Sequence, residues 1–259
     1  MPAYSVVIPA HNEEARIGRT LRDYAGAFPD GEVIVVVNAC SDGTAAAVRR
    51  SGTPNVRVLE IEEPIGKGGA VRAGFAVAAS PLVGYADADG ATSGAELRRL
   101  FSLLVSCDAV IGSRWLPGAR LCPPQPLSRR VASRTFNFCV RAMTGLRYSD
   151  TQCGAKVFRA DAIRGAMAMI ETANFAFDVD LLVELRRSDK RIVEEPISWN
   201  DTAGSRLRLL PSAVRMFAAL LRLTMKRNLL RPFVPIFDRL FPTQPLPAAR
   251  IDGRLSTAH

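Results

Sequence analysis

The stretch Tyr85-Ala86-Asp87-Ala88-Asp89-Gly90-Ala91-Thr92 decides the fold and the chemistry that we expect. It continues an apolar run, 81–86, that reads as a short buried strand. Side chains alternate along an extended segment, so Asp87 and Asp89 face the same way at the carboxyl end of that strand, where open α/β sheets bind ligands. Paired carboxylates there predict a site for Mg²⁺ or Mn²⁺ beside a nucleotide diphosphate. The alternative is a simple polar turn, because Asp and Gly favour turns.

The residues around this stretch alternate between strand and helix patterns. Expected strands cover 4–9, 32–37, 56–61, 82–86 and 109–112, and expected helices cover 13–28, 44–50, 68–79 and 95–105. Repeated strand–helix units predict an α/β fold with a mostly parallel, doubly wound central sheet flanked by helices. After Trp115, a Pro-rich loop precedes expected helices at 128–143 and 177–187 and expected strands at 155–159 and 191–195.

The C-terminal part has a different pattern. Residues 206–231 read as one basic amphipathic helix, whose apolar stripe contains Phe217, Leu221 and Met225. A helix of this kind can lie in a membrane interface. The alternative is a helix that docks on the domain and leaves its charges in solvent. We expect residues 232–259 to form a loosely ordered tail.

Composition narrows the classes of function. The five cysteines are scattered without a Cys-x-x-Cys pair, which argues against a disulfide framework and against a zinc site. The two histidines, His11 and His259, make a mechanism with a histidine base unexpected. No run of 18 uncharged apolar residues occurs and the first expected strand begins at Tyr4, so we expect neither a transmembrane helix nor a signal peptide. These features predict a cytoplasmic protein.

The net charge of +9 is regional rather than even. Residues 114–147 contain seven arginines and no acid. A basic region of this kind predicts anionic partners, such as phosphates or an anionic membrane surface. No nucleic-acid-binding motif accompanies the charge, so we expect no nucleic-acid partner. A protein held by such charges would be peripheral on the inner face of the membrane.

Seven short motifs follow one another in a recognisable order. They are IPAHNEE at 8–14, SDGT at 41–44, GKGGA at 66–70, DADGAT at 87–92, GSR at 112–114, DTQCGAK at 150–156 and WNDTAGS at 199–205. Together they resemble family 2 glycosyltransferases of the GT-A fold, and more narrowly the dolichyl-phosphate β-glucosyltransferase and polyprenyl-phosphate glycosyltransferase group. The resemblance implies one GT-A domain at 1–205, with a nucleotide-sugar half at about 1–113 and an acceptor half at about 114–205.

The resemblance assigns a donor side of the site. It makes Asp87 and Asp89 the metal ligands, with Asp89 as the principal one. The remaining donor-side residues flank the uridine or bind the diphosphate: Pro9, His11, Glu13, Asn38, Lys67 and Arg206. Lys67 also fits on physical grounds, because it lies between glycines at an expected helix start, where free N–H groups and an ammonium favour phosphate. Glu13 has the alternative role of an acid in the first turn of a helix.

The acceptor side carries the remaining expected site residues. The resemblance places Asp150 near the acceptor, and Asp89, Asp150 and Arg114 form the expected catalytic set. A carboxylate at Asp150 can serve as general base for a hydroxyl acceptor, whereas an ionised lipid phosphate needs no base. Cations would then offset the meeting of two anions. The candidates for binding the acceptor phosphate, besides Arg114, are Arg129, Arg130, Arg134 and Lys156.

One departure from the family affects nucleotide choice. The family usually has V-D-D-G-S where this chain has Val37-Asn38-Ala39-Cys40-Ser41, so a uracil-reading carboxylate is absent. Asn38 can still hydrogen-bond a base through its amide. We expect an inverting, metal-dependent transfer of glucose from UDP-glucose to a polyprenyl phosphate, with GDP-mannose left open as donor. A saccharide or small-molecule hydroxyl as acceptor, and a non-catalytic membrane-surface protein with a decayed nucleotide site, remain the alternatives.

Overall fold

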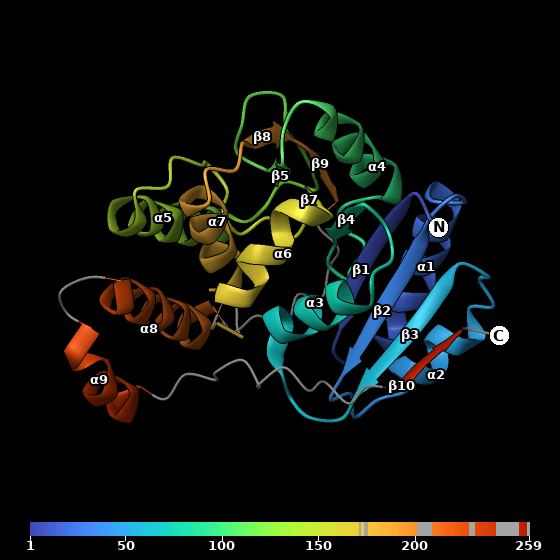
Figure 1. Ribbon diagram of the computed structural model, residues 1–259, viewed down its shortest axis with the longest axis horizontal. Coiled ribbons are helices and arrows are strands. Elements are labelled where there is room, and N and C mark those ends of the chain that lie inside the picture. The colour runs from blue at the N-terminus through green and yellow to red at the C-terminus, as the bar shows by residue number, and fades with distance from the viewer. Residues whose placement is uncertain (171, 174–175, 201–208, 228–230, 242–253, 258–259) are drawn as a thin grey trace.

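The structure is a computed structural model of the 259-residue chain, and every structural statement below concerns the residues that it describes. These are residues 1–170, 172–173, 176–200, 209–227, 231–241 and 254–257. Helices lie on both faces of the central sheet (Figure 1).

The central sheet has eight strands in the order β10-β3-β2-β1-β4-β7-β5-β8. The strands are β1 (Tyr4–Ala10), β2 (Glu32–Asn38), β3 (Val56–Ile61), β4 (Leu82–Tyr85), β5 (Ala109–Ser113), β7 (Lys156–Arg159), β8 (Ile192–Pro196) and β10 (Arg254–Thr257). The pairs β1–β2, β2–β3, β1–β4 and β5–β8 are parallel, whereas β7 is antiparallel to both β4 and β5, and β10 is antiparallel to β3. A small parallel pair joins β6 (Arg120–Cys122) to β9 (Ser198–Asn200).

Helices cover both faces of this sheet. They are α1 (Glu14–Ala27), α2 (Thr44–Arg50), α3 (Gly66–Val77), α4 (Gly94–Ser102), α5 (Leu127–Thr144), α6 (Ala160–Met169), α7 (Phe177–Arg187), α8 (Leu209–Arg227) and α9 (Val234–Leu240), with 3₁₀ turns η1 (Leu103–Val105) and η2 (Arg231–Phe233). Helices α1, α2 and α4 pack on the face that carries Val6 and Ile8, and α3, α6 and α7 pack on the face that carries Val7. All of β2 is buried, as expected for a strand covered on both sides.

The strand directions gather the carboxyl ends of β1, β2, β4 and β5 at one edge of the sheet. Because β7 runs the other way between β4 and β5, it brings its first residue to that same edge. Lys156 therefore lies opposite Tyr85, the last residue of β4. This topology positions the candidate site.

The α/β architecture and the mostly parallel sheet agree with the sequence-based expectation. The elements that the sequence did not indicate are β6, α6, β9, α9 and β10. Two of them lie in residues 232–259, where we expected a loosely ordered tail. Helix α9 packs on α8 and buries Val234, and β10 pairs with β3 at the edge of the sheet.

Helix α8, which corresponds to the expected basic amphipathic helix, docks on the domain. Among the α8 side chains that the structure describes, 216–226, the buried ones are Ala219, Leu220 and Leu223. Leu220 and Leu223 join a small apolar cluster with α5 and α7. The expected apolar stripe through Phe217 is not the buried face, since Phe217 is exposed. No helix among the described residues is both long enough and apolar enough to cross a membrane.

Candidate functional site

The two expected metal ligands lie in the loop that follows β4. Asp87 forms an ion pair with Lys67 of α3, with 2.8 Å between Nζ and Oδ1. Asp89 accepts a hydrogen bond from the backbone N–H of Ala91 at 3.0 Å. Burial, and then the charge of Asp87, raise the pKa of Asp89 above its usual value. A carboxylate whose ionisation is opposed by a neighbouring carboxylate is suited to a divalent cation, which takes one or two carboxylates and completes its shell with water and substrate phosphates.

The Asp87 carboxylate rests against Gly154, which follows Cys153 in the loop before β7. A methyl group added to Gly154 would meet Oδ2 of Asp87 at 1.9 Å and Cγ at 2.3 Å. Glycine is therefore required at this position for Asp87 to keep its place. Among the described residues, no cluster of three or more His, Cys, Asp or Glu side chains is arranged to hold a metal. The expected metal ligands therefore remain the two aspartates, a pair that fits a cation shared with a diphosphate.

A buried ion-pair network lies behind this pair. Asp178 of α7 is 1% exposed and accepts from Nζ of Lys156 at 2.5 Å. Lys67 lies 3.7 Å from the same carboxylate, and the Tyr85 hydroxyl donates to it. Burial alone would raise the pKa of Asp178, but the charges of Lys156 and Lys67 hold it below its usual value. Burial opposes the charge of Lys67 as well, yet Asp178 and Asp87 raise its pKa. Lys67 is thus a cation held between two carboxylates.

Lys156 does not lie where we expected it. Its side chain is 0% exposed, and Nζ donates to the Cys153 carbonyl at 2.5 Å as well as to Asp178. The reason is the antiparallel direction of β7, which sets Lys156 beside Tyr85 inside the sheet layer. In this structure Lys156 neutralises a buried carboxylate instead of facing an acceptor phosphate.

The end of β1 and the loop that follows it carry three of the expected donor-side residues. Pro9 lies within β1, paired with Val36 of β2. The exposed ring of His11 is hydrogen-bonded through Nδ1 to the Asn38 carbonyl oxygen at 2.8 Å. Glu13 precedes α1 and is ion-paired with Arg16, whose Nη2 lies 2.9 Å from Oε1.

Arg16 was not among the expected site residues. Its positive charge interacts with Asp89 and Asp87 as well as with Glu13. The Glu13–Arg16 pair therefore extends the candidate site along the start of α1. In this structure the Glu13 carboxylate is paired with Arg16, whereas we expected it to accept a hydrogen bond from a ribose hydroxyl.

The side chain of Asn38 is committed to the fold. Its amide nitrogen donates to the carbonyl oxygens of Glu63 at 2.6 Å and Ile61 at 3.4 Å, and its amide oxygen accepts from the Ile65 N–H at 3.2 Å. The residue is buried. Both amide hydrogens are therefore used to hold the loop between β3 and α3. This arrangement differs from the expected role of Asn38 in reading a base.

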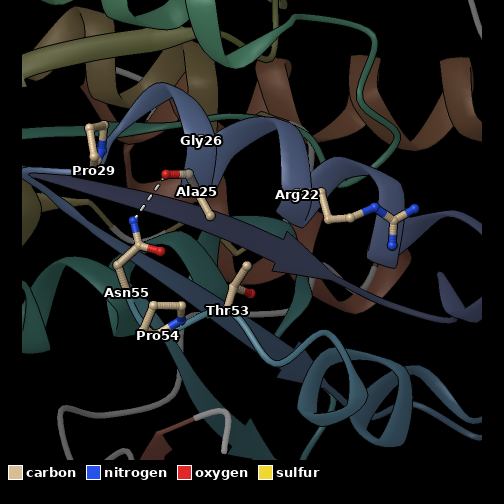
Figure 2. Close-up of a pocket in the computed structure, with 7 residues that line it drawn as sticks. All are labelled: Arg22, Ala25, Gly26, Pro29, Thr53, Pro54 and Asn55. Carbon is tan, nitrogen blue, oxygen red and sulfur yellow. Dashed lines mark hydrogen bonds between the residues drawn. The ribbon is translucent and has the colours of Figure 1, made fainter.

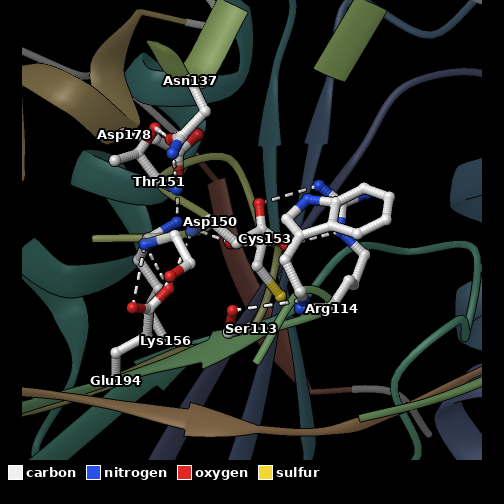
Figure 3. Close-up of polar contacts among 11 residues, drawn as sticks. Ser113, Arg114, Asn137, Asp150, Thr151, Cys153, Lys156, Asp178 and Glu194 are labelled. Carbon is white, nitrogen blue, oxygen red and sulfur yellow. Dashed lines mark hydrogen bonds and ion pairs between the residues drawn. The ribbon is translucent and has the colours of Figure 1, made fainter. Parts of the chain in front are cut away.

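Arg114 and Asp150 form a bidentate ion pair on the expected acceptor side (Figure 3). The guanidinium donates through Nε to Oδ2 at 2.7 Å and through Nη2 to Oδ1 at 3.0 Å, and the Arg114 N–H donates to Oδ2 at 3.0 Å. Glu194 fixes the backbone of the same loop by accepting from the N–H groups of Ser149 and Asp150. Burial would raise the pKa of Asp150, but Arg114 holds it below its usual value. Asp150 is thus a paired, ionised carboxylate.

Aromatic rings connect this pair to α5. The Arg114 guanidinium lies 5.0 Å from the ring centre of Trp199 and 5.9 Å from that of Trp115. Arg134 of α5 lies 5.6 Å from the Trp115 ring. Cations over ring faces are favourable at these distances. Arg134 therefore reaches the candidate site.

The other expected acceptor-side cations, Arg129 and Arg130, lie in the first turns of α5. Arg130 is exposed and Arg129 is partly buried. Arg206 lies outside the described residues.

Comparison with known proteins identifies the family. The family model described as glycosyl transferase family 2 matches residues 5–165. The chain belongs to this family. It is 36% identical over 199 residues to an undecaprenyl-phosphate mannosyltransferase of Micrococcus luteus, across 74% of this chain and 82% of that protein. It is 32% identical over 224 residues to a dolichyl-phosphate β-glucosyltransferase of Drosophila melanogaster, across 78% of this chain and 68% of that protein.

A solved structure supports the same fold for this glycosyltransferase. Glucosyl-3-phosphoglycerate synthase from Mycobacterium tuberculosis superposes with a TM-score of 0.66 at 19% identity, covering 87% of this chain and 80% of that chain. That crystal contains Mn²⁺, UDP and glucosyl-3-phosphoglycerate. The expected GT-A fold and the polyprenyl-phosphate glycosyltransferase group are thereby confirmed for this chain.

One surface hollow of this glycosyltransferase lies away from the site (Figure 2). It is lined by Arg22, Ala25, Gly26, Pro29, Thr53, Pro54 and Asn55, between the end of α1 and the start of β3. The start of β3 is at the opposite edge of the sheet from Asp87. The hollow contains no carboxylate, and Asn55 uses its amide to hold the carbonyl oxygens of Ala25 and Phe28 at 3.3 and 2.8 Å. We assign it no role in transfer.

Sequence reasoning missed several residues that shape the site. Asp178, Arg16, Gly154 and Glu194 have no place in the expected set, although Gly154 lies inside one of its motifs. The signal for Asp178 was available in part, because it is an acid within the otherwise apolar run 175–179. An acid in such a run requires a buried partner. Which lysine supplies that partner depends on the sheet topology.

Proposed function

We propose that this family 2 glycosyltransferase moves a hexose from a nucleotide sugar to a polyprenyl phosphate with inversion at the anomeric carbon. UDP-glucose is the donor that we favour. The observation that carries the proposal is the bidentate Arg114–Asp150 pair, with its additional bond from the Arg114 N–H. A carboxylate engaged at both oxygens and with a lowered pKa is a poor general base. An acceptor that is already ionised needs none.

The names of the relatives agree with this acceptor. The Micrococcus luteus protein is named for undecaprenyl phosphate and the Drosophila melanogaster protein for dolichyl phosphate. They differ in the sugar, since one is a mannosyltransferase and the other a glucosyltransferase. Because Asn38 is used by the fold, the base must be read by other groups, and GDP-mannose is the competing donor.

The donor side is assigned to Lys67, Asp87, Asp89 and the loop after β1. Asp87 and Asp89 would hold Mg²⁺ or Mn²⁺, which would supply Lewis-acid stabilisation of the leaving diphosphate. Lys67 starts α3, so its ammonium and the first N–H groups of the helix both favour phosphate. On binding, Lys67 exchanges its contact with Asp87 for a diphosphate oxygen and stays near Asp178, which lies 3.7 Å away.

The acceptor side is assigned to the arginines. An ionised phosphate oxygen attacks the anomeric carbon opposite the leaving group, and its negative charge approaches that of the donor. Arg134, beside Trp115, offsets this charge, together with Arg129 and Arg130 at the start of α5. Asp150 positions Arg114, and through it the two tryptophan rings that line this side. The protein then works peripherally at a membrane, on its cytoplasmic face.

Two variants test this proposal. Asp89→Ala removes the principal ligand, so we expect loss of transfer and loss of the Mn²⁺-dependent part of thermal stabilisation by UDP-glucose. Asp150→Asn keeps the shape of the side chain and removes its charge. We expect a loss of kcat within about tenfold, whereas removal of a true general base costs about 10²–10⁴-fold. A fully active Asp89→Ala variant would refute the metal role, and a loss of several orders of magnitude in Asp150→Asn would point to a hydroxyl acceptor.

The donor is tested separately by thermal stabilisation. UDP, GDP, UDP-glucose and GDP-mannose are compared with and without Mn²⁺. A ligand at a hundred times its dissociation constant adds about 2.7 kcal/mol of stability. Stabilisation by UDP-glucose alone supports glucose transfer, and stabilisation by GDP-mannose alone refutes it.

A further inference from the structure

Exposed apolar side chains gather on one group of helices. Eight of the eleven exposed large hydrophobic side chains of the described residues lie on α5, on α8 and in residues 231–241, which contain η2 and α9. Helix α5 packs on α8, and α8 packs on α9. In Figure 1 these three helices form one end of the molecule, away from β1, β2 and β3. The apolar exposure is therefore concentrated rather than scattered, and a concentrated patch indicates an interaction surface.

Helix α5 has the clearest arrangement. Leu127, Val131 and Phe138 are 72%, 57% and 70% exposed. At 3.6 residues per turn these three positions fall within about 40° around the helix axis. The opposite side of α5 holds Val140, which is buried against the α7 and α8 cluster. The helix is thus anchored by one side and presents apolar side chains on the other.

Arginines border this apolar strip. Arg130, Arg134 and Arg141 are exposed and fall within the neighbouring 40° or so of the same helix. Helix α5 contains no acid. An apolar strip beside a row of arginines fits the boundary between anionic lipid headgroups and acyl chains, where the arginines pair with phosphates and the apolar side chains enter the chain region.

The strip is continuous with the candidate site, because Arg134 borders it and also lies over the Trp115 ring beside Arg114. A polyprenyl phosphate lies in the bilayer with its phosphate at headgroup level. We propose that the exposed face of α5, extended by α9, is a docking surface for an anionic lipid bilayer that sets the acceptor phosphate at the level of Trp115 and Arg134. The proposal rests on the proposed function for the acceptor, and on the exposure and charge of α5 for the surface.

Vesicle binding tests the surface without any transfer reaction. The full chain is sedimented with vesicles of phosphatidylglycerol and phosphatidylcholine, and with vesicles of phosphatidylcholine alone. The variant L127S/V131S/F138S removes the strip. V105S is the matched control, because Val105 is 92% exposed and ends η1, which is not part of α5, α8 or α9. We expect wild type and V105S to bind the anionic vesicles equally, with weaker binding at high salt. The triple variant should lose at least about tenfold in partitioning.

Three results overturn the proposal. One is a wild-type protein that does not bind anionic vesicles, and another is a triple variant that binds them as wild type does. The third is a dimer in gel filtration that the triple substitution converts to a monomer without an effect on vesicles, which would mean that a second copy covers this face.

Transfer to a short, water-soluble polyprenyl phosphate, measured without vesicles, separates this proposal from the proposed function. We expect the triple variant to retain that activity. If wild type transfers to no polyprenyl phosphate but the triple variant still binds vesicles more weakly than wild type, the proposed function is wrong and the docking surface is supported. If wild type does transfer and the triple variant binds vesicles as wild type does, only the docking surface is wrong.

Discussion

Asp178→Asn removes one negative charge from the interior of this glycosyltransferase while keeping the shape of the side chain. Asp178 is 1% exposed and Lys156, its partner at 2.5 Å, is 0% exposed. The variant leaves the Lys156 ammonium buried without its carboxylate. Removing one partner of a buried ion pair costs about 3–5 kcal/mol, because the other charge stays desolvated. At about 2–4 °C per kcal/mol for a domain near this size, we expect the melting temperature to fall by roughly 6–20 °C.

The control is an ion pair at the surface. Asp161→Asn breaks the Arg159–Asp161 pair, which spans 3.6 Å between side chains that are 47% and 72% exposed. Exposed pairs contribute about 0–1 kcal/mol, so this variant should unfold almost as wild type does. The double variant Asp178→Asn/Lys156→Met removes both buried charges and should recover part of the lost stability. The assay is urea unfolding of all four proteins, compared by midpoint and slope.

The pH dependence of the difference in unfolding stability between wild type and Asp178→Asn gives an independent check. The pKa of Asp178 is lowered in the folded protein, because the charges of Lys156 and Lys67 outweigh the effect of burial. The unfolded chain binds a proton near the ordinary Asp value of about 3.9, so the stabilisation is fully present above that pH and is lost as the pH falls further. The gap between wild type and Asp178→Asn should therefore be constant near neutral pH and shrink below about pH 4. An Asp178→Asn midpoint equal to that of Asp161→Asn would refute the reasoning.

The remaining predictions concern the site and its loops. Gly154→Ala places a methyl 1.9 Å from the Asp87 carboxylate, so it should displace that carboxylate and abolish Mn²⁺-dependent stabilisation by UDP-glucose. The control Gly165→Ala has open space around the added methyl and should leave that stabilisation unchanged. Normal ligand binding by Gly154→Ala would contradict the contact. Asn38→Ala should lower stability by about 1–3 kcal/mol by leaving buried backbone groups unpaired, without altering the ratio of UDP to GDP affinity. A changed ratio in titration calorimetry would instead return Asn38 to base reading.

Local patterns in the sequence predicted most of the strands and helices of the fold. The continuous Val/Ile run of β2 and the alternation of strands and helices through β5 are readable because each element's periodicity is set by its own burial. Strand β10 was missed because it is short and becomes a strand by pairing with β3, nearly two hundred residues earlier in the chain. Helix α8 was found, but its buried face was not. The partner is α5, and only the partner determines that Leu220 and Leu223 face inward while Phe217 does not.

The site divides in the same way. The meeting of Asp87, Asp89 and Lys67 at one edge of the sheet was predictable, because each follows a strand end or starts a helix. Their roles in binding remain predictions. Lys156 was misplaced because its motif gives the residue type but not the direction of β7.

That single reversal changes which cations are available to substrates. Lys156 takes the buried carboxylate of Asp178, and Lys67 is the lysine that remains at the edge, between Asp178 and Asp87. A cation bound at Asp87 would compete with Lys67 for the same oxygen, whereas a diphosphate would attract both. Binding of metal and nucleotide should therefore be mutually favourable, because the diphosphate supplies the negative charge that lets Lys67 leave Asp87. The charge balance among Lys67, Asp87 and Asp178, rather than any one motif, is therefore the reason to expect that the metal cation and the nucleotide diphosphate bind together.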